Sequence, residues 1–319
     1  MKRMWRFVGG LVLTMGLSAC EPIDDGGGGG GGGDVLFTRG FAFLRDDRNV
    51  YVVDDEGDPN SPQRLTTGGG ASFPSVSRNG RSVVYVQQTA SGFEVRTVLT
   101  DASANPSTVF ASGNTQCPGC TNFRSPTFSP SGSVIVFAFN RGAGSNYSLA
   151  RVNADGSGFQ TLTPNLATLS YGAPSFVDGQ RVLAPAGTSS STLNQLELVS
   201  LDGTITSVTG NLGNGIVSVV NRAAVSPDGR QVAIDGRTSA GGTRIFVGPL
   251  FPYGPLRAVT DHPGEQGVQD SFPSWMTDTQ VGFLSAGRTQ GIYRVTTTAT
   301  EGPGTLLIPT ASEPSYGGT

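Results

Sequence analysis

The sequence predicts an all-β protein, a six-bladed β-propeller of four-stranded antiparallel blades with almost no helix in the mature chain. Three observations support this prediction. A segment of about 50 residues recurs along the chain, and glycine and proline are abundant, at 47 and 20 of 319 residues. No window after Cys20 keeps the 3.6-residue apolar period of a helix. Each recurring segment contains four short strand-like runs, which is the pattern of a propeller blade.

The first residues have the pattern of a bacterial export signal. Lys2, Arg3 and Arg6 form a positive region, and the apolar stretch behind them is shorter than the roughly 20 residues that span a bilayer. This stretch ends in Leu17-Ser18-Ala19-Cys20, which resembles a lipobox. In a lipobox the cysteine is acylated and becomes the first residue of the mature chain, so we predict a lipid (palmitate-containing) anchor on Cys20. The alternative is an ordinary cleaved signal with an incidental cysteine.

A glycine tether follows the predicted anchor. Gly26 to Gly33 is an unbroken glycine run, typical of a flexible spacer. A phosphate-binding glycine loop would need a strand before it and a helix after it. We therefore divide the chain into a signal peptide (1–19), the lipidated cysteine with its tether (20–34) and the propeller (35–319). Acyl chains would hold the chain on a lipid bilayer of the cell envelope, and Glu21 after the cysteine resembles cargo of the outer rather than the inner membrane.

Five aligned segments define the repeat. The second residue of each segment is Pro74, Pro126, Pro174, Ala223 or Pro273. These aligned positions are 52, 48, 49 and 50 residues apart. Residues 35–319 therefore hold six units. Proline is tolerated at the start of an edge strand. Two positions later stands an apolar or aromatic residue that we expect to point inward, namely Val76, Phe128, Phe176, Val225 and Trp275.

A tight turn separates the first strand of each unit from the second. In Ser226-Pro227-Asp228-Gly229 the proline presets φ, the aspartate can bond its own backbone and the glycine can take a left-handed conformation. Weaker copies stand at 77–80 and 129–132. In the second half of the unit a third strand leads into a turn, and a fourth ends in an apolar residue and a threonine, as at Leu65-Thr66, Leu162-Thr163, Val208-Thr209 and Val259-Thr260.

These motifs resemble the repeats of TolB-type β-propellers, a WD-like group also called PD repeats. The resemblance covers roughly residues 35–316 and rests on the turn at 226–229, the preceding Pro-x-aromatic pattern, and Asn-Ala-Asp-Gly-Ser at 153–157 with the Leu-Thr that follows it. It implies a six-bladed ring. The sequence departs from TolB in two ways: it carries a lipobox, and only a signal and a tether stand where TolB has an α/β domain.

The two ends of the propeller are predicted to share one blade. The first unit begins in mid-blade, at Phe41–Leu44, without a Pro-x-aromatic strand. The chain ends with Glu313-Pro314-Ser315-Tyr316, which has this pattern. We predict that the C-terminal segment supplies the inner strand of the first blade. In the alternative, Val35-Leu36-Phe37 supplies it and the C-terminal segment is a frayed tail.

Two side-chain clusters are candidate sites. Cys117 and Cys120 are expected to form a structural disulfide that pins a loop in an exported protein, with a redox pair and a metal site as alternatives. Asp54, Asp55, Glu56 and Asp58 crowd one turn, and close carboxylates can bind Ca²⁺. The spacing of an EF-hand is missing, so we interpret these four residues as a solvated turn and only weakly as a calcium site, and we predict no metal.

Composition argues against several function classes. The net charge of −3 does not favour nucleic-acid binding. His262 is the sole histidine, too few for a histidine-rich metal site, and we expect it to be exposed in the loop between two blades without a catalytic role. No Gly-x-Ser-x-Gly motif of a serine hydrolase occurs. We therefore predict no catalytic residues, no cofactor and no enzymatic activity.

The predicted function is that of a membrane-anchored, non-catalytic β-propeller lipoprotein. We expect a monomer that acts as a protein–protein interaction or scaffolding module of the bacterial cell envelope, in the periplasm or at the surface. Two polar loops, 142–147 and 188–192, are candidate contact surfaces for an envelope protein or polymer. The alternative is a carbohydrate-binding or carbohydrate-active propeller, either lectin-like or a hydrolase or lyase.

Overall fold

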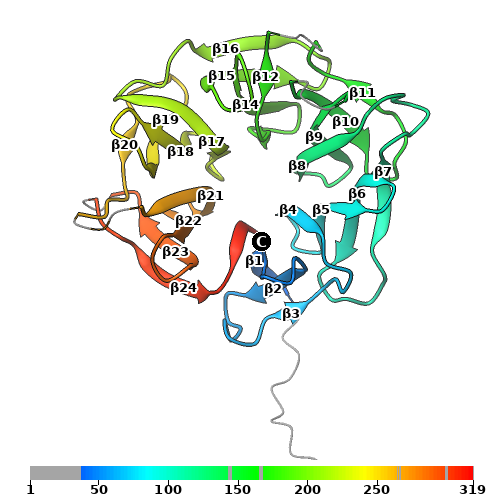
Figure 1. The fold of residues 1–319 in the computed structure, drawn as a ribbon, viewed down its shortest axis with the longest axis horizontal. Helices are drawn as coiled ribbons and strands as arrows, with labels where there is room; N and C mark the ends of the chain where they lie inside the picture. Colours follow the sequence, from blue (N-terminus) through cyan, green and yellow to red (C-terminus); the bar gives the residue numbers. More distant parts are fainter. Residues whose placement is uncertain are drawn as a thin grey trace, which may run out of the picture. The chain divides into compact units, whose positions relative to one another are not determined.

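The computed structural model describes residues 37–142, 146–164, 168–263, 265, 267–298 and 301–318. All regular secondary structure in these residues is β-strand, and the sheets surround a central axis as a ring (Figure 1). The prediction of an all-β propeller is confirmed. No helix in this part of the chain is long and apolar enough to cross a membrane. The predicted signal peptide, Cys20 and the tether lie outside the described residues.

The described strands form six antiparallel groups, which we call blades one to six. Three are separate four-stranded sheets, each ordered from the inner to the outer strand: β25 (Ser312–Gly318), β1 (Arg39–Leu44), β2 (Val50–Asp54) and β3 (Gln63–Arg64); β4 (Ala71–Val76), β5 (Ser82–Thr89), β6 (Gly92–Leu99) and β7 (Ser107–Ala111); β8 (Asn122–Phe128), β9 (Val134–Asn140), β10 (Ser148–Asn153) and β11 (Gln160–Thr161).

The remaining strands repeat this arrangement. Blade four has its inner strand in two pieces, and blades five and six are regular: β12 (Ser170–Tyr171) and β13 (Ser175–Phe176), then β14 (Arg181–Gly187), β15 (Leu193–Ser200) and β16 (Ile205–Thr209); β17 (Ile216–Val225), β18 (Gln231–Thr238), β19 (Thr243–Pro249) and β20 (Arg257–Ala258); β21 (Gln269–Thr277), β22 (Gln280–Ala286), β23 (Gly291–Thr296) and β24 (Thr305–Pro309). Single residue pairs, Leu193 with Val219 and Thr243 with Gln269, link these three blades into one longer hydrogen-bonded path.

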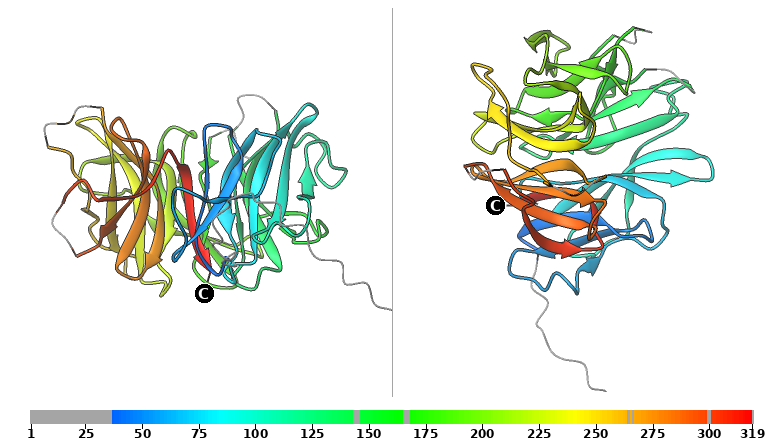
Figure 2. Two further views of the ribbon diagram at one scale, coloured as in Figure 1. Left: turned by 90° about the horizontal axis from the view of Figure 1, so that it is seen from below. Right: turned by 60° about the vertical axis from the view of Figure 1, so that its left-hand side comes forward.

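The two ends of the propeller meet in blade one. β25 pairs antiparallel with β1, with Tyr316 opposite Phe41 and Gly318 opposite Arg39, and Figure 2 shows the red C-terminal strand beside the blue first strand. The prediction that the C-terminal segment supplies the inner strand is confirmed, and the alternative of a frayed tail is wrong.

The core lies between the blades. Buried apolar residues form six clusters among the described residues, and each cluster joins two neighbouring blades. In β5, Val83 and Tyr85 pack toward blade one whereas Val84 and Val86 pack toward blade three. The second strand of a blade is therefore buried on both faces, which explains its nearly continuous apolar run. A blade without its neighbours would expose two apolar faces.

The predicted turns have the expected geometry. Gly80, Gly132 and Gly229 have φ of 71°, 74° and 72°, in the left-handed region that glycine adopts without strain. Ser226 stabilises its turn twice, because its hydroxyl donates to Asp228 Oδ1 at 2.6 Å and accepts the backbone N–H of Gln231 at 2.9 Å.

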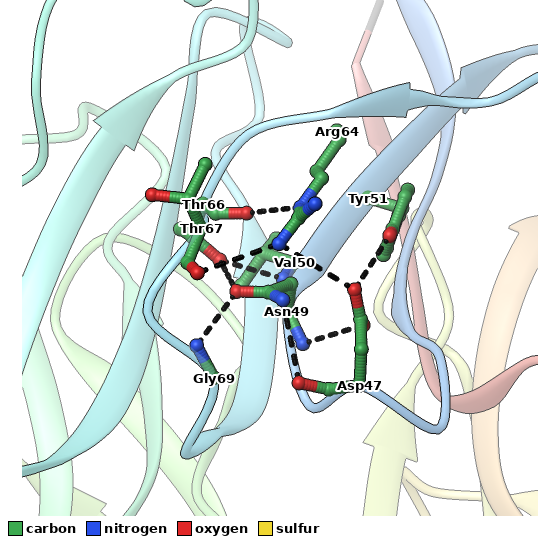
Figure 3. Close-up of polar contacts among 8 residues, drawn as sticks. All are labelled: Asp47, Asn49, Val50, Tyr51, Arg64, Thr66, Thr67 and Gly69. Atoms are coloured by element: carbon green, nitrogen blue, oxygen red, sulfur yellow. Dashed lines mark hydrogen bonds and ion pairs between the residues drawn. The ribbon is translucent and has the colours of Figure 1, made fainter.

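The repeated threonine at the end of the fourth strand also has a structural role. In three blades its hydroxyl oxygen accepts a backbone N–H near the start of the third strand: Val50 to Thr66 at 2.9 Å, Leu149 to Thr163 at 2.8 Å and Ile245 to Thr260 at 3.0 Å. Figure 3 shows this contact in blade one, where Asn49 Oδ1 also accepts the Thr66 hydroxyl and the Gly69 N–H. The threonine side chain thus adds a hydrogen bond to the third strand beyond the end of the short fourth strand.

Removing residues 311–319 tests the closure. We expect the melting temperature to fall by roughly 10 °C or more, because β1 loses its inner partner and the core between blades one and six is exposed. Circular dichroism melting of the truncated chain measures this. Leu306→Ser in β24 is the control, since Leu306 is 38% exposed and its replacement should change the melting temperature little. An unchanged melting temperature of the truncated chain would contradict the closure.

Candidate functional site

The inner strands of all six blades line a cavity of about 370 Å³ on the propeller axis. We call it the central channel. Its walls include the residues predicted to point inward, with a sixth from β25: Val76, Phe128, Phe176, Val225, Trp275 and Tyr316. That prediction is confirmed, and the repeated motif therefore builds the wall of one shared cavity.

A β-bulge in the inner strand places these side chains. In four blades the residue before the proline has a positive φ, namely Phe73 at 52°, Ser125 at 48°, Phe272 at 54° and Glu313 at 50°. The strand register shifts at each of these positions. Residues before proline normally stay extended, so this conformation must be held by its surroundings. The bulge redirects backbone N–H groups away from the strand ladder.

Serine hydroxyls in the channel wall connect neighbouring blades. Each of three serines that follow the proline accepts a backbone N–H of the next blade: Val225 to Ser175 at 3.1 Å, Tyr316 to Ser274 at 2.8 Å and Val76 to Ser315 at 3.2 Å. In blade five Ala224 replaces the serine, and its carbonyl accepts the indole N–H of Trp275 at 2.9 Å. Within the described chain, none of the three hydroxyl groups donates its own proton to a protein acceptor, so these protons can be donated into the channel.

Arg222 crosses the channel from β17 to β25. Its Nη1 donates to the carbonyl oxygen of Pro314 at 3.0 Å, and its guanidinium carbon lies 5.8 Å from the ring centroid of Phe272. No carboxylate of the described residues forms an ion pair with it. Burial lowers the pKa of Arg222, although the charges of Asp235 and Glu313 act in the opposite direction. Arg222 is half-buried, and its guanidinium keeps unused N–H donors beside the channel.

Asp235 fixes the backbone that carries Arg222. Its fully buried carboxylate accepts five N–H groups: those of the Val220, Asn221 and Arg222 backbone at 3.2, 2.9 and 2.9 Å, the Asn221 side chain at 2.9 Å and the Phe272 backbone at 3.0 Å. Burial raises the pKa of Asp235, and these hydrogen bonds oppose that shift. Asp235 therefore fastens the bulge of blade five to the inner strand of blade six.

Glu313 has the corresponding role between blades one and two. Its Oε2 accepts the Phe73 N–H at 2.6 Å, and its Oε1 lies 3.3 Å from Arg48 Nη1. Both carboxylates next to the channel are thus occupied by protein donors. The charged side chains among the described residues that line the cavity are Arg78 and Arg222, so the channel presents donors and positive charge in a chain whose net charge is negative.

Solved structures with the same arrangement are found, although no protein-family model and no curated protein sequence matches the chain. TolB from Acinetobacter baumannii has a TM-score of 0.63 at 14% identity, over 89% of this chain and 67% of that one. Kuenenia stuttgartiensis hydrazine synthase has a TM-score of 0.66 at 14% identity, over 89% and 47%. Oligogalacturonate lyase from Vibrio parahaemolyticus has a TM-score of 0.54 at 13% identity, over 81% and 74%. The fold is that of the TolB-like propellers.

The cysteine pair of this TolB-like propeller lies away from the channel wall. Cys117 and Cys120 form a disulfide in the loop between β7 and β8. Both side chains are buried in the core cluster between blades two and three, where they join Phe110 and Phe123.

The four acidic residues of the predicted turn do not converge on one point. Asp54 Oδ2 accepts the backbone N–H groups of Thr38 and Arg39 at 2.7 and 3.1 Å, whereas Asp55 bonds the Arg39 guanidinium and the Tyr316 hydroxyl. Burial would raise the pKa of Asp54, but its hydrogen bonds outweigh burial and lower it. Glu56 bonds the Asp54 carboxylate through its backbone N–H, and Asp58 bonds Asn60. In the described part of the chain no three His, Cys, Asp or Glu side chains are placed to share a metal ion.

Calcium should therefore not stabilise the propeller. We expect the melting temperature of the full chain to stay within about 1 °C when roughly 5 mM Ca²⁺ is added, a concentration that would fill even weak extracellular sites. Differential scanning fluorimetry with Ca²⁺, Mg²⁺ and EDTA measures this. A rise of several degrees with Ca²⁺ alone, abolished by Asp55→Asn, would contradict it.

His262 is buried, so the expectation that it is exposed was wrong. Its side chain is 6% exposed, and its Nε2 lies 2.7 Å from Asp270 Oδ2. Asp270, near the start of β21, is fully buried, and a buried carboxylate needs a partner. His262 lies beside the hairpin at Gly241 and Gly242, and neither His262 nor Asp270 lines the channel.

The two candidate contact loops come together. Asn146 Nδ2 donates to the Thr188 carbonyl at 3.4 Å, so blades three and four present them side by side. Within the second loop the hydroxyls bond one another, with Ser189 Oγ 2.8 Å from Thr192 Oγ1. Of the first loop, residues 143–145 lie outside the described residues.

Sequence reasoning missed Arg222 and Asp235, although the repeat carries a signal for both. Where four other copies have a proline, blade five has Ala223 preceded by Arg222. By strand register, Asp235 stands in a position that is apolar in four other blades, where it is equivalent to Val86, Ala138, Pro185 and Leu284. A charged residue at an otherwise apolar repeat position indicates a special contact.

Asp235→Asn tests whether this carboxylate holds the bulge. We expect a loss of about 2 to 4 kcal/mol of unfolding free energy, because the amide would present N–H groups to N–H donors. Urea denaturation measures it. Asp101→Asn is the matched control, since Asp101 is an exposed turn residue whose oxygen accepts the Ser103 N–H and asparagine keeps that acceptor. Equal stability of the two variants would contradict the role of Asp235.

Proposed function

We propose that this chain is a membrane-anchored, non-catalytic propeller that binds another protein of the bacterial cell envelope. The composition of the channel wall supports the proposal. Apolar and aromatic side chains, hydroxyl groups and two arginines line it, and these groups recognise a ligand by contact and hydrogen bonding. No described lining side chain is a carboxylate, imidazole or thiol, the groups that most often transfer protons in catalysis.

The rigidity of the wall also favours binding. Each inner strand is bonded or packed to its neighbours, and the core clusters hold the blades against one another. A preformed surface loses little conformational entropy when a partner binds. The adjoining loops at Asn146 and Thr188–Thr192 form a second, separate polar surface on blades three and four.

We further propose that acylated Cys20 anchors the propeller in the lipid bilayer, at the outer rather than the inner membrane. The lipobox-like sequence and the glycine run support this anchor. The tether over 20–34 would let a monomeric propeller, over 35–319, reach a partner near the membrane.

The alternative is a carbohydrate-binding or carbohydrate-active propeller. The structural similarity to oligogalacturonate lyase favours it, together with the arginine in the channel, because a guanidinium can bind the carboxylate of an acidic sugar.

Cross-linking in cells followed by affinity purification and mass spectrometry tests the proposed function. We expect the full chain to capture a specific envelope protein, and Cys20→Ser, which removes the anchor without changing the propeller, to capture less of it. A panel of polysaccharides is the second arm. Turnover of any of them by the purified protein would contradict the non-catalytic proposal and favour the alternative.

A further inference from the structure

We propose that the central channel binds the C-terminal carboxylate of a partner polypeptide, with Arg222 as the residue that pairs with it. This inference rests on the proposed function and specifies how the partner is recognised. Three features of the channel support it: the charge of Arg222, the orientation of the surrounding hydrogen-bond donors and the size of the cavity.

Arg222 lacks a charge partner in the described chain. A guanidinium has five N–H donors, and a single hydrogen bond, to the Pro314 carbonyl, uses one of them. Asp235 and Glu313 are near enough to act on it electrostatically, but their oxygens accept other donors. Arg222 is half-buried, and a partly desolvated cation without a charge partner is costly. A carboxylate can accept two parallel N–H bonds from a guanidinium, so it offsets this cost better than a neutral ligand.

The wall around Arg222 offers donors to an acceptor. The hydroxyls of Ser175, Ser274 and Ser315 have already accepted a backbone N–H, so each is left with a proton to donate. A carboxylate only accepts hydrogen bonds and fits such a wall. A neutral sugar carries many hydroxyl protons that need acceptors, and the apolar side chains of Phe128, Phe176 and Trp275 provide none.

These apolar side chains suit the rest of a peptide end. The cavity of about 370 Å³ lies at the lower end of the range for ligand sites, so it admits the last few residues of a chain rather than a folded surface. An apolar final side chain would pack on the aromatic wall. Arg78, which is exposed and also lines the cavity, would attract the negative end of the partner.

Trp275 provides a direct readout. It lines the channel, and the sequence contains one further tryptophan, Trp5, so full-length Trp5→Phe protein reports on the channel alone. The probes are two pools of N-acetylated tetrapeptides with Val, Leu or Phe at the last position. One pool ends in a free carboxylate and the other in an amide.

We expect the carboxylate pool to change Trp275 fluorescence saturably and to bind at least about tenfold more tightly than the amide pool, as a charge-assisted pair predicts. Arg222→Gln should abolish this preference, whereas Arg222→Lys should keep part of it. Arg151→Gln is the matched control, because Arg151 bonds Gln160 in the outer part of blade three and does not line the channel. The two peptide pools can be compared on the protein with Arg222 unaltered even if a variant fails to fold, so the inference remains testable.

Equal binding of the two pools, absence of binding by either pool, or an undiminished preference in a folded Arg222→Gln protein would overturn the inference. Tighter binding of oligogalacturonate than of the peptides would overturn the peptide assignment. Capture of the same envelope protein by the unaltered chain and by Arg222→Gln would overturn this inference and leave the proposed function standing. Failure of the unaltered chain to capture any protein would instead count against the proposed function.

Discussion

The packing of each blade against two neighbours is the constraint on which the rest of the structure depends. Because the middle strands are apolar on both faces, every blade needs a blade on either side, and only a closed ring meets this need for all of them. The pairing of β25 with β1 brings the two ends of the ring into one sheet. The common cavity on the axis, and its wall of equivalent residues from successive units, follow from that closure.

The sequence predicted the features that repeat. Each of these features depends on contacts within one unit, and its recurrence makes it visible in the sequence. They are the turn at 226–229, the proline two residues before an inward side chain and the terminal Leu-Thr pair. Closure was predictable because the missing strand of the first unit and the extra strand at Glu313–Tyr316 complement each other.

The sequence did not predict contacts that break the repeat. Arg222 pairs with Pro314 across the channel, 92 positions away, and His262 is buried because Asp270 lies against it. The first pairing depends on how distant blades are positioned around the axis, whereas the second joins residues eight positions apart and depends on the conformation of the segment that leads into β21. In the sequence Asp54 and Asp55 similarly resemble metal ligands. In the structure their carboxylates accept hydrogen bonds from the backbone next to β1 and from a side chain of β25.

The shared sheet also affects how the chain can mature. The first blade joins segments far apart in the chain, since Arg39 in β1 pairs with Gly318 in β25, so its innermost position stays vacant until residues 312–318 have been synthesised. Contacts this distant are slow to form because a long loop must close first. A growing polypeptide therefore exposes the inner edge of β1 until β25 has formed, and chaperones that protect apolar surfaces would be needed longest at this edge.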